Sequence, residues 1–290
     1  MTAYHARRAT TETFELAEGP VWDAVNDRVL WVDILAGTVL SGRLDGAGIT
    51  VTGSRSFGEP VGAVLPAADG RLAVVARERI LFAAEGGAVE AGPVVVPTGA
   101  RSRTNDAAVD PAGRLLVGTH PFDGGDGSEV LVQLDGDRVR VLDDDLLLSN
   151  GLCWSPDGGT LYSVDTLAAT VWARDYDVGS GATGPRRVHL EVDGMPDGMC
   201  ADTDGNLWIA FWGRGEVRRY DATGAVIDTV AVDAPHTSSV AFAGPGLHTL
   251  VITTARADLD ADALAAAPAS GALFTAEVAA QGLPQPRYRR

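Results

Sequence analysis

Lysine is absent from this 290-residue chain, and all 23 basic residues are arginine. A Schiff-base mechanism and a P-loop nucleotide site are therefore excluded, because each needs a lysine amino group. The two cysteines are too few to build a disulfide framework. Neither G-x-S-x-G nor H-E-x-x-H occurs in the chain, so the sequence marks of the serine hydrolases and the zinc proteases are missing as well.

Long apolar runs are also missing. The hydrophobic fraction is 46%, yet no apolar segment is long enough to span a bilayer, and the N-terminus lacks the apolar core of a secretory signal. The 39 acidic against 23 basic residues give a net charge of −16, which disfavours nucleic acid as a partner and suits a cation-binding surface. We expect a cytoplasmic protein without a membrane partner; the sequence does not indicate its oligomeric state.

A repeat organises the chain. The segments RVLWVD, RLAVVA, RLLVGT, TLYSVD, NLWIAF and TLVITT share an alternating apolar pattern. Their anchor residues, spaced 43 or 46 residues apart, are Val29, Leu72, Leu115, Leu161, Leu207 and Leu250. A period of this length with several strands per unit is typical of β-propellers. We predict an all-β fold, a six-bladed β-propeller that forms a single domain over residues 1–290.

The sixth repeat is incomplete. Repeats one to five each show four strand-like segments, whereas the chain ends in QGLPQPRYRR without a fourth strand in repeat six. We expect the N-terminal strand, within residues 4–16, to supply it, because that would close the ring and remove two exposed sheet edges. The alternative is a frayed terminus. Alanine and leucine between the last two strands also predict a short helix that stops at Pro268.

Polar residues recur at the start of the innermost strands, ten to twelve residues before each anchor. The six positions are Glu18, Val61 or Gly62, Asn105, Asn150, Asp197 and Ser238. Because all innermost strands of a propeller run in the same direction along the channel, these positions form one ring at one mouth. Such residues often bond to local backbone at strand starts. Four oxygen-bearing side chains in register instead favour a ligand at that mouth.

The donor set indicates which ligand. Carboxylate and carboxamide oxygens without cysteine or histidine suit a hard divalent cation such as Ca²⁺, Mg²⁺ or Mn²⁺, and Zn²⁺ is possible though less typical. Cys153 and Cys200, three residues after two ring positions, are expected to be buried, reduced neighbours. Asp33 and Asp165 repeat one another at the ends of second strands and are expected to bind turn backbone.

Four motifs carry a resemblance to a known family. Glu18-Gly-Pro-Val-Trp, Arg103-Thr-Asn-Asp with Val-Asp-Pro-Ala-Gly-Arg after it, Ser-Asn150-Gly-Leu and Pro-Asp197-Gly-Met-Cys occur in this order. Over nearly its whole length the chain resembles the gluconolactonase, regucalcin and senescence-marker-protein family. The resemblance implies a six-bladed propeller with one divalent metal, bound by Glu18, Asn150 and Asp197, and in many members hydrolysis of sugar lactones.

The resemblance also implies a substrate site. Arg103 and Asn105 match the family's substrate-contacting Arg-x-Asn, and a family glutamate falls on Asp123, which is shorter by one methylene. This departure concerns the identity of the sugar rather than the reaction. The family analogy makes Asp197 the general acid and base. Coordination to a cation lowers the basicity of a carboxylate, so the base is either a monodentate Asp197 or a hydroxide held by the metal.

We therefore expect divalent-metal-dependent hydrolysis of a sugar lactone, an aldonolactone, to the aldonic acid. The first alternative is a non-catalytic calcium-binding propeller that acts as a binding or regulatory module. The second alternative is a related propeller that acts on phosphotriesters or other esters. The fold alone does not distinguish it from a lactone hydrolase. Arg103, Asn105 and Asp123 favour the enzyme, because a pure cation buffer has no need of them.

Overall fold

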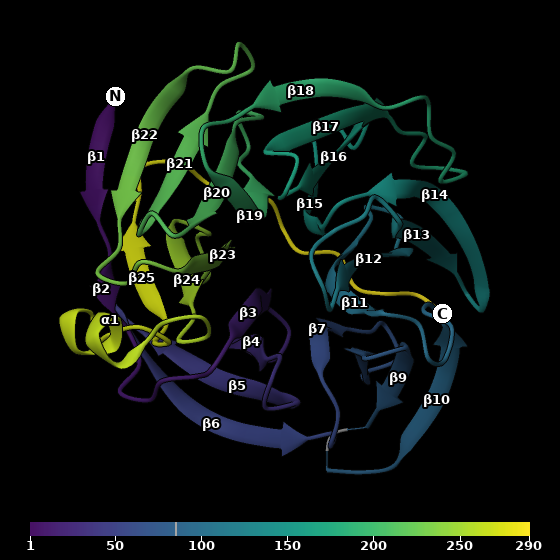
Figure 1. The fold of residues 1–290 in the computed structure, drawn as a ribbon, viewed down its shortest axis with the longest axis horizontal. Helices are drawn as coiled ribbons and strands as arrows, with labels where there is room; N and C mark the ends of the chain where they lie inside the picture. Colours follow the sequence, from purple (N-terminus) through teal and green to yellow (C-terminus); the bar gives the residue numbers. More distant parts are fainter. Residues whose placement is uncertain (85) are drawn as a thin grey trace.

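The computed structural model describes residues 1–84 and 86–290. Six sheets surround a central axis (Figure 1), which confirms the predicted all-β, six-bladed propeller. The predicted helix is also found as α1 (Ala261–Ala266). Asp260 caps its N-terminus, and the Asp260 side chain accepts a hydrogen bond from the Ala263 N–H at 2.8 Å. Within the described residues, no helix is both long and apolar enough to cross a membrane.

Each blade takes its strands in chain order from the axis outward. Blade one contains β3 (Ala17–Asp23), β4 (Arg28–Asp33), β5 (Thr38–Asp45) and β6 (Gly48–Ser56). Blade two contains β7 (Val61–Pro66), β8 (Leu72–Ala76), β9 (Arg79–Ala83) and β10 (Val89–Val94). Blade three contains β11 (Ser102–Val109), β12 (Leu115–Pro121), β13 (Glu129–Asp135) and β14 (Arg138–Leu146). Blade four contains β15 (Ser149–Trp154), β16 (Thr160–Asp165), β17 (Thr170–Asp175) and β18 (Arg187–Glu191). Blade five contains β19 (Met195–Ala201), β20 (Leu207–Trp212), β21 (Glu216–Tyr220) and β22 (Val226–Ala231). Blade six contains β23 (Thr237–Ala243), β24 (Thr249–Thr254) and β25 (Phe274–Glu277).

The turn between the first two strands of blade four shows how the repeat folds locally. Gly158 has φ 72°, a left-handed conformation that glycine adopts without strain. The Asp157 carboxylate accepts hydrogen bonds from the Ser155 hydroxyl at 2.6 Å and the Gly159 N–H at 2.9 Å. Asp and Gly thereby reverse the chain, and the next strand returns along the first.

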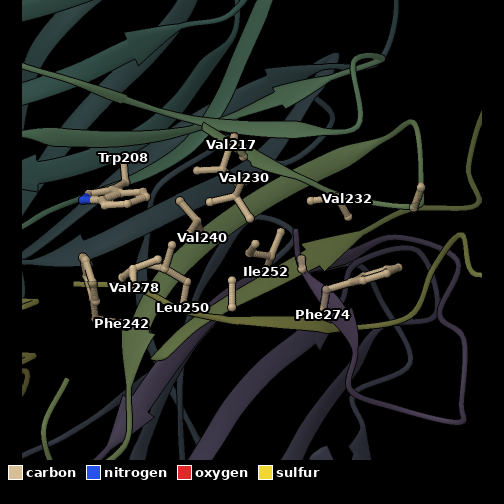
Figure 2. Packing of buried hydrophobic residues seen from close by; sticks show 14 of the residues in the cluster. Trp208, Val217, Val230, Val232, Val240, Phe242, Leu250, Ile252, Phe274 and Val278 are labelled. Atoms are coloured by element: carbon tan, nitrogen blue, oxygen red, sulfur yellow. The ribbon is translucent and has the colours of Figure 1, made fainter. Parts of the chain in front are cut away.

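The apolar core lies between neighbouring blades. Figure 2 shows the cluster where blades five and six face each other, with Trp208 and Phe242 in an edge-to-face contact at 5.9 Å between ring centroids. Trp208 is fully buried, and Val230 and Leu250 pack into the same cluster. Because each blade buries both faces against its neighbours, the inner strands are held in fixed positions around the axis.

The N-terminal segment closes the ring, as predicted, but it does so with less chain than expected. β2 (Arg7–Arg8) pairs antiparallel with β25 and is the fourth strand of blade six. β1 (Thr2–His5) instead pairs in parallel with β22 of blade five. The exposed edge of β22 accepts this extra strand, so one segment ties two blades together.

The last ten residues, 281–290, form a segment that we call the C-terminal strap. It contacts the turns at which the inner strands end: Thr203 N–H donates to the Gln281 carbonyl at 2.8 Å, and Tyr288 N–H to the Pro66 carbonyl at 3.0 Å. The Tyr288 ring is buried and stacks on Phe82 at 5.9 Å. In Figure 1 its yellow trace crosses the ring from blade six toward blade three. The strap therefore covers the end of the channel opposite the strand starts.

Candidate functional site at the channel mouth

The ring positions lie where the repeat places them, at the starts of inner strands. Glu18 is in β3, Asn105 in β11, Asn150 in β15 and Asp197 in β19, and each side chain is 5–7% exposed. Ser238 in β23 is fully buried and donates a hydrogen bond to the Ala17 carbonyl at 2.6 Å. Four oxygen-bearing side chains and one hydroxyl are thus enclosed at one end of the channel.

Glycines after ring residues let the inner strands approach closely. A Cβ atom at Gly151 would lie 2.5 Å from the Asp197 carbonyl oxygen, and one at Gly62 would overlap the Asn105 carbonyl. A Cβ at Gly198 would overlap Ser239. Backbone of one blade therefore packs directly on the ring residue of the next, which requires glycine at these positions.

A chain of hydrogen bonds joins the predicted residues of blades three and four. Arg103 Nη1 donates to Asn105 Oδ1 at 2.6 Å, and Asn105 Nδ2 donates to Asn150 Oδ1 at 2.6 Å. Asn150 Nδ2 donates to Thr166 Oγ1 at 2.8 Å, and that hydroxyl donates to the Pro196 carbonyl at 2.7 Å. This chain fixes the orientations of Arg103 and of both amides. It ends at Pro196, the residue that precedes Asp197.

The two ring carboxyl groups, Glu18 and Asp197, have raised pKa values. Burial, reinforced by the nearby Asp106, raises the pKa of Glu18 to about 8. Burial and the charges of Glu18 and Asp106 raise the pKa of Asp197 well above its usual range. Arg103 opposes both shifts, but no side chain among the described residues forms an ion pair with Glu18 or Asp197. The fold therefore provides too little positive charge to keep both groups ionised at neutral pH, and each retains a proton more readily than a free carboxyl does.

Asp106 belongs to this group, although the sequence analysis did not single it out. Burial raises its pKa to about 6, and its exposed surface faces an internal cavity. The signal was available in the repeat. The position after the ring residue is glycine in four blades, and in blade three it is an aspartate.

The internal cavity, of about 460 Å³, lies on the strap side of the ring. It is lined by residues further along the inner strands, among them Asp106, Cys153 and Cys200, and by residues 283–286 of the strap. Both thiols are free, as predicted, and burial raises the pKa of each. Glu18, Asn150, Asp197 and Arg103 are not among its lining residues. The candidate chemistry thus belongs to the mouth and not to this cavity.

Asp123 does not join the other predicted residues. Its carboxylate forms an ion pair with Arg101 on the surface, and its side chain is 65% exposed. Its role in substrate binding stays a prediction. The acid of blade three that acts electrostatically on Arg103 is Glu129, at the start of β13. It is buried and accepts a hydrogen bond from Ser102 Oγ at 2.6 Å. No repeat position marked Glu129 in the sequence.

The neighbours of Arg103 complete the site. Burial lowers the pKa of Arg103 to about 10, and Glu18, Asp197 and Glu129 oppose that shift. Burial and the Arg103 charge lower the pKa of His120 to about 4, so His120 is neutral at pH 7. Asp33 and Asp165 bind turn backbone, as predicted: Asp33 accepts from the Glu15 N–H at 2.9 Å and Asp165 from the Leu148 N–H at 3.1 Å.

The donor chemistry at the mouth fits a hard divalent cation. No cluster of three His, Cys, Asp or Glu side chains suited to a metal occurs among the described residues, so a carboxamide oxygen would have to complete the set. Asn150 Oδ1 is oriented by the Asn105 amide, and the carboxylates of Glu18 and Asp197 at equivalent strand starts lack ion-pair partners among the described residues. These three residues could hold the ion.

Comparisons with known proteins identify the family of the chain. Residues 16–256 match the family model described as the SMP-30/gluconolactonase/LRE-like region. The chain is 34% identical to pentonolactonase XacC of Haloferax volcanii over 96% of each chain, and 34% identical to 6-deoxy-6-sulfogluconolactonase of Pseudomonas putida over 94% of each. The crystal structure of regucalcin from Agrobacterium tumefaciens, a calcium-binding protein, superposes over the whole of both chains with a TM-score of 0.93 at 27% identity.

Proposed function

Because the chain belongs to the SMP-30/gluconolactonase/LRE-like family, we propose that it is a lactone hydrolase that opens an aldonolactone at the channel mouth. The observation that carries the proposal is the pairing of uncompensated buried carboxylates with the ordered chain from Arg103 to Asn150. Buried carboxylates without ion-pair partners are suited to binding a cation. The enclosed Arg103 guanidinium beside them is suited to binding a polar substrate.

We propose further that one divalent metal binds to Glu18, Asn150 and Asp197. When bound, such an ion polarises the lactone carbonyl and neutralises the two carboxylates. The related regucalcin is described as calcium-binding, and carboxylate with amide oxygen suits Ca²⁺, Mg²⁺ or Mn²⁺ better than Zn²⁺.

The chain's own residues supply proton transfer and orientation. Asp197 accepts a proton from the attacking water, whose oxygen forms a bond to the lactone carbonyl carbon. The bond between that carbon and the ring oxygen then breaks, and the ring oxygen takes the proton from Asp197, which gives the aldonic acid. With one carboxylate oxygen toward the ion, the other oxygen of Asp197 would be free to take and return this proton.

Arg103 and Asn105 orient the substrate. The Arg103 guanidinium donates through Nη1 to Asn105 and to the Thr104 carbonyl at 3.0 Å. Its other N–H groups are left for substrate hydroxyl or carbonyl oxygens. Asn105 fixes both Arg103 and Asn150, so it couples the substrate-binding residue to a proposed metal ligand.

A non-catalytic calcium-binding module is the second candidate, and the regucalcin relationship favours it. It does not account for Arg103. Enclosing a guanidinium that has no ion-pair partner among the described residues is unfavourable, and a cation-binding protein gains nothing from a positive charge beside its ligands. The lactone hydrolase explains both the carboxylates and the arginine.

The deciding experiment assays metal-stripped protein against a panel of aldonolactones, restoring one divalent metal at a time. Acid release is followed with a pH indicator, and the same lactone and metal without protein measure spontaneous lactone opening. We expect turnover to return with at least one metal and one lactone. Calorimetric calcium binding without turnover on any lactone would favour the non-catalytic module.

A further inference from the structure

A second arginine, Arg77, stands at the mouth beside Arg103. It follows β8, whose last residue Ala76 pairs with the ring position Val61, so Arg77 lies just beyond the ring. Its carbonyl accepts the Thr104 N–H at 2.9 Å, and the Thr104 hydroxyl donates to the Ala76 carbonyl at 2.7 Å. The end of β8 is thereby fixed against the start of β11, which carries Arg103.

The Arg77 side chain crosses from blade two to blade three. Its guanidinium lies over the Phe122 ring, 5.0 Å from the centroid. Phe122 is 47% exposed and follows His120, which pairs with Arg103 across β11 and β12. A cation–π contact of this kind positions the guanidinium without using its terminal N–H groups as hydrogen-bond donors. Arg77 Nε is enclosed without a hydrogen-bond partner.

Acids of the neighbouring segments have other partners. Glu78 accepts a hydrogen bond from Thr98 at 2.9 Å, Asp123 pairs with Arg101, and Oε1 of Glu129 accepts from Ser102, while Glu129 Oε2 has no partner. Among the described residues no carboxylate forms an ion pair with Arg77. In a chain with 39 acidic residues and net charge −16, the positive charge of an arginine held in this way at the mouth is available to an anionic ligand.

We propose that Arg77, stacked on Phe122, is a subsite for an anionic group on the substrate, so that the preferred substrate is an acidic sugar lactone. The inference rests on the proposed lactone hydrolysis and names its substrate class. Arg103 faces the reacting end, and Arg77 binds a phosphate, sulfonate or carboxylate at the opposite end of the sugar chain. A guanidinium matches the paired oxygens of all three groups.

The first test compares neutral glucono-1,5-lactone with the same lactone carrying a phosphate, a sulfonate or a carboxylate at its far end. We expect the parent to prefer at least one anionic lactone, and Arg77→Gln to lower kcat/KM for that substrate by about 10- to 100-fold, as loss of a charged hydrogen bond does. The neutral lactone should change by less than about threefold. The anion that responds identifies which of the three groups is bound.

Two further variants separate charge from structure. Arg79→Gln removes the same charge two residues further on, where the side chain belongs to β9 and pairs with β10, and it should leave both substrates unaffected. Arg77→Lys keeps the charge without the planar stack and should restore part of the preference. Equal losses on neutral and anionic lactones in Arg77→Gln would overturn the proposal, as would a parent without any anionic preference.

A binding measurement keeps this inference distinct from the proposed function. Glucose 6-phosphate and glucose differ in the anionic group and have no lactone to open. We expect calorimetry to show tighter binding of the phosphate by the parent, and loss of that difference in Arg77→Gln. If no lactone is hydrolysed but this difference is found, the anion subsite stands and the lactonase fails. If lactones are hydrolysed and this difference is absent, the subsite fails alone.

Discussion

Buried carboxylates occur at both ends of the inner strands, and the protein surrounds them in opposite ways. At the strap end lie Asp23 and Asp202, which are 1% and 0% exposed. At the mouth lie Glu18 and Asp197, which are 7% and 6% exposed. The depth of burial is thus nearly the same, and the difference lies in the partners.

The strap-end acids are fully partnered by the fold. Asp202 accepts hydrogen bonds from Trp208 Nε1 at 3.0 Å, from Arg219 Nε at 2.7 Å and from the Asn206 N–H at 3.0 Å. Asp23 accepts from Asn26, Arg28 and Arg287 at 2.6–3.0 Å. Burial acts to raise the pKa of Asp23, yet these donors hold it below its usual value. Folding alone satisfies these charges.

The mouth acids lack such partners. Glu18 accepts one hydrogen bond, from the Gly19 N–H at 2.7 Å, and its pKa rises to about 8. A hydrogen bond from the Gly198 N–H lowers the pKa of Asp197, but burial and the neighbouring carboxylates hold it well above its usual range. The comparison teaches that one end was built for stability and the other for a ligand that supplies the missing charge.

Replacing Asp197 by Asn should have the largest effect. The amide oxygen can still coordinate a cation, but it cannot accept the proton of water at neutral pH. We expect kcat/KM to fall by about 10²- to 10⁴-fold at saturating metal, with the metal-free protein as stable as the parent or more so. Lactone kinetics and thermal unfolding check this. Turnover within about tenfold of the parent would remove Asp197 as the base.

At the strap end, Asp202→Ala should do the reverse. Its loss leaves Trp208 Nε1 buried without an acceptor, removes the acceptor of the Asp204 and Asn206 N–H groups and removes one partner of Arg219. We expect the free energy of unfolding to fall by about 3–5 kcal/mol, measured by urea denaturation. The folded fraction should retain the parent kcat/KM. A variant as stable as the parent would contradict the contrast between the two ends.

Arg103→Ala separates the cation site from the substrate site within the mouth. The guanidinium contacts Asn105 and precedes the ring position by two residues, so it is not a ligand. We expect kcat/KM to fall by about 10²-fold, as loss of a positioned charge does, while calorimetric metal affinity changes little. Equal losses of metal binding and activity would place Arg103 in the metal site instead.

The sequence predicts what the repeat carries. Blade number and the ring of Glu18, Asn105, Asn150 and Asp197 follow from strand phase, because equivalent positions of a propeller recur at one level of the channel. The family resemblance that the motifs carry is likewise confirmed by the match over residues 16–256. The repeat therefore predicts reliably at which level of the channel a residue lies.

What lies outside the period was not predictable. The outward pairing of Asp123 with Arg101 depends on the conformation of one loop, and the C-terminal strap depends on Tyr288 fitting beside Phe82. The placement of β1 on blade five depends on a free sheet edge that the sequence does not mark. Asp106 was missed for a different reason: its signal was the departure from glycine at a repeated position, which needs the glycine's packing role to be known first.

The smallest effect expected is a pH dependence of metal binding. Glu18 has a pKa of about 8 in the metal-free protein against 4.5 ordinarily, so below pH 8 a cation must displace its proton. We expect the dissociation constant to rise about tenfold per pH unit as pH falls below 8, for each proton displaced. Calorimetry in buffers of different ionisation enthalpy measures the protons released. A pH-independent affinity between pH 6 and 8 would contradict the shifted pKa of Glu18.

The strap end provides the control for this prediction, because there the pKa shift, and with it the pH dependence of stability, has the opposite sign. The raised pKa of Glu18 gives the metal-free protein a stability contribution that is present below pH 4.5 and lost as pH rises through about 8. The lowered pKa of Asp23 gives one that is present above 3.8 and lost as pH falls. The increase in Tm on adding metal should therefore grow from pH 5 to 8 and then level off. In Glu18→Gln the increase should depend less on pH, since no Glu18 proton remains to compete with the cation. In Asp23→Asn the pH dependence of the increase should persist, on a lower baseline Tm. An equal pH dependence in both variants would show that the two ends do not differ in the way their carboxylates are compensated.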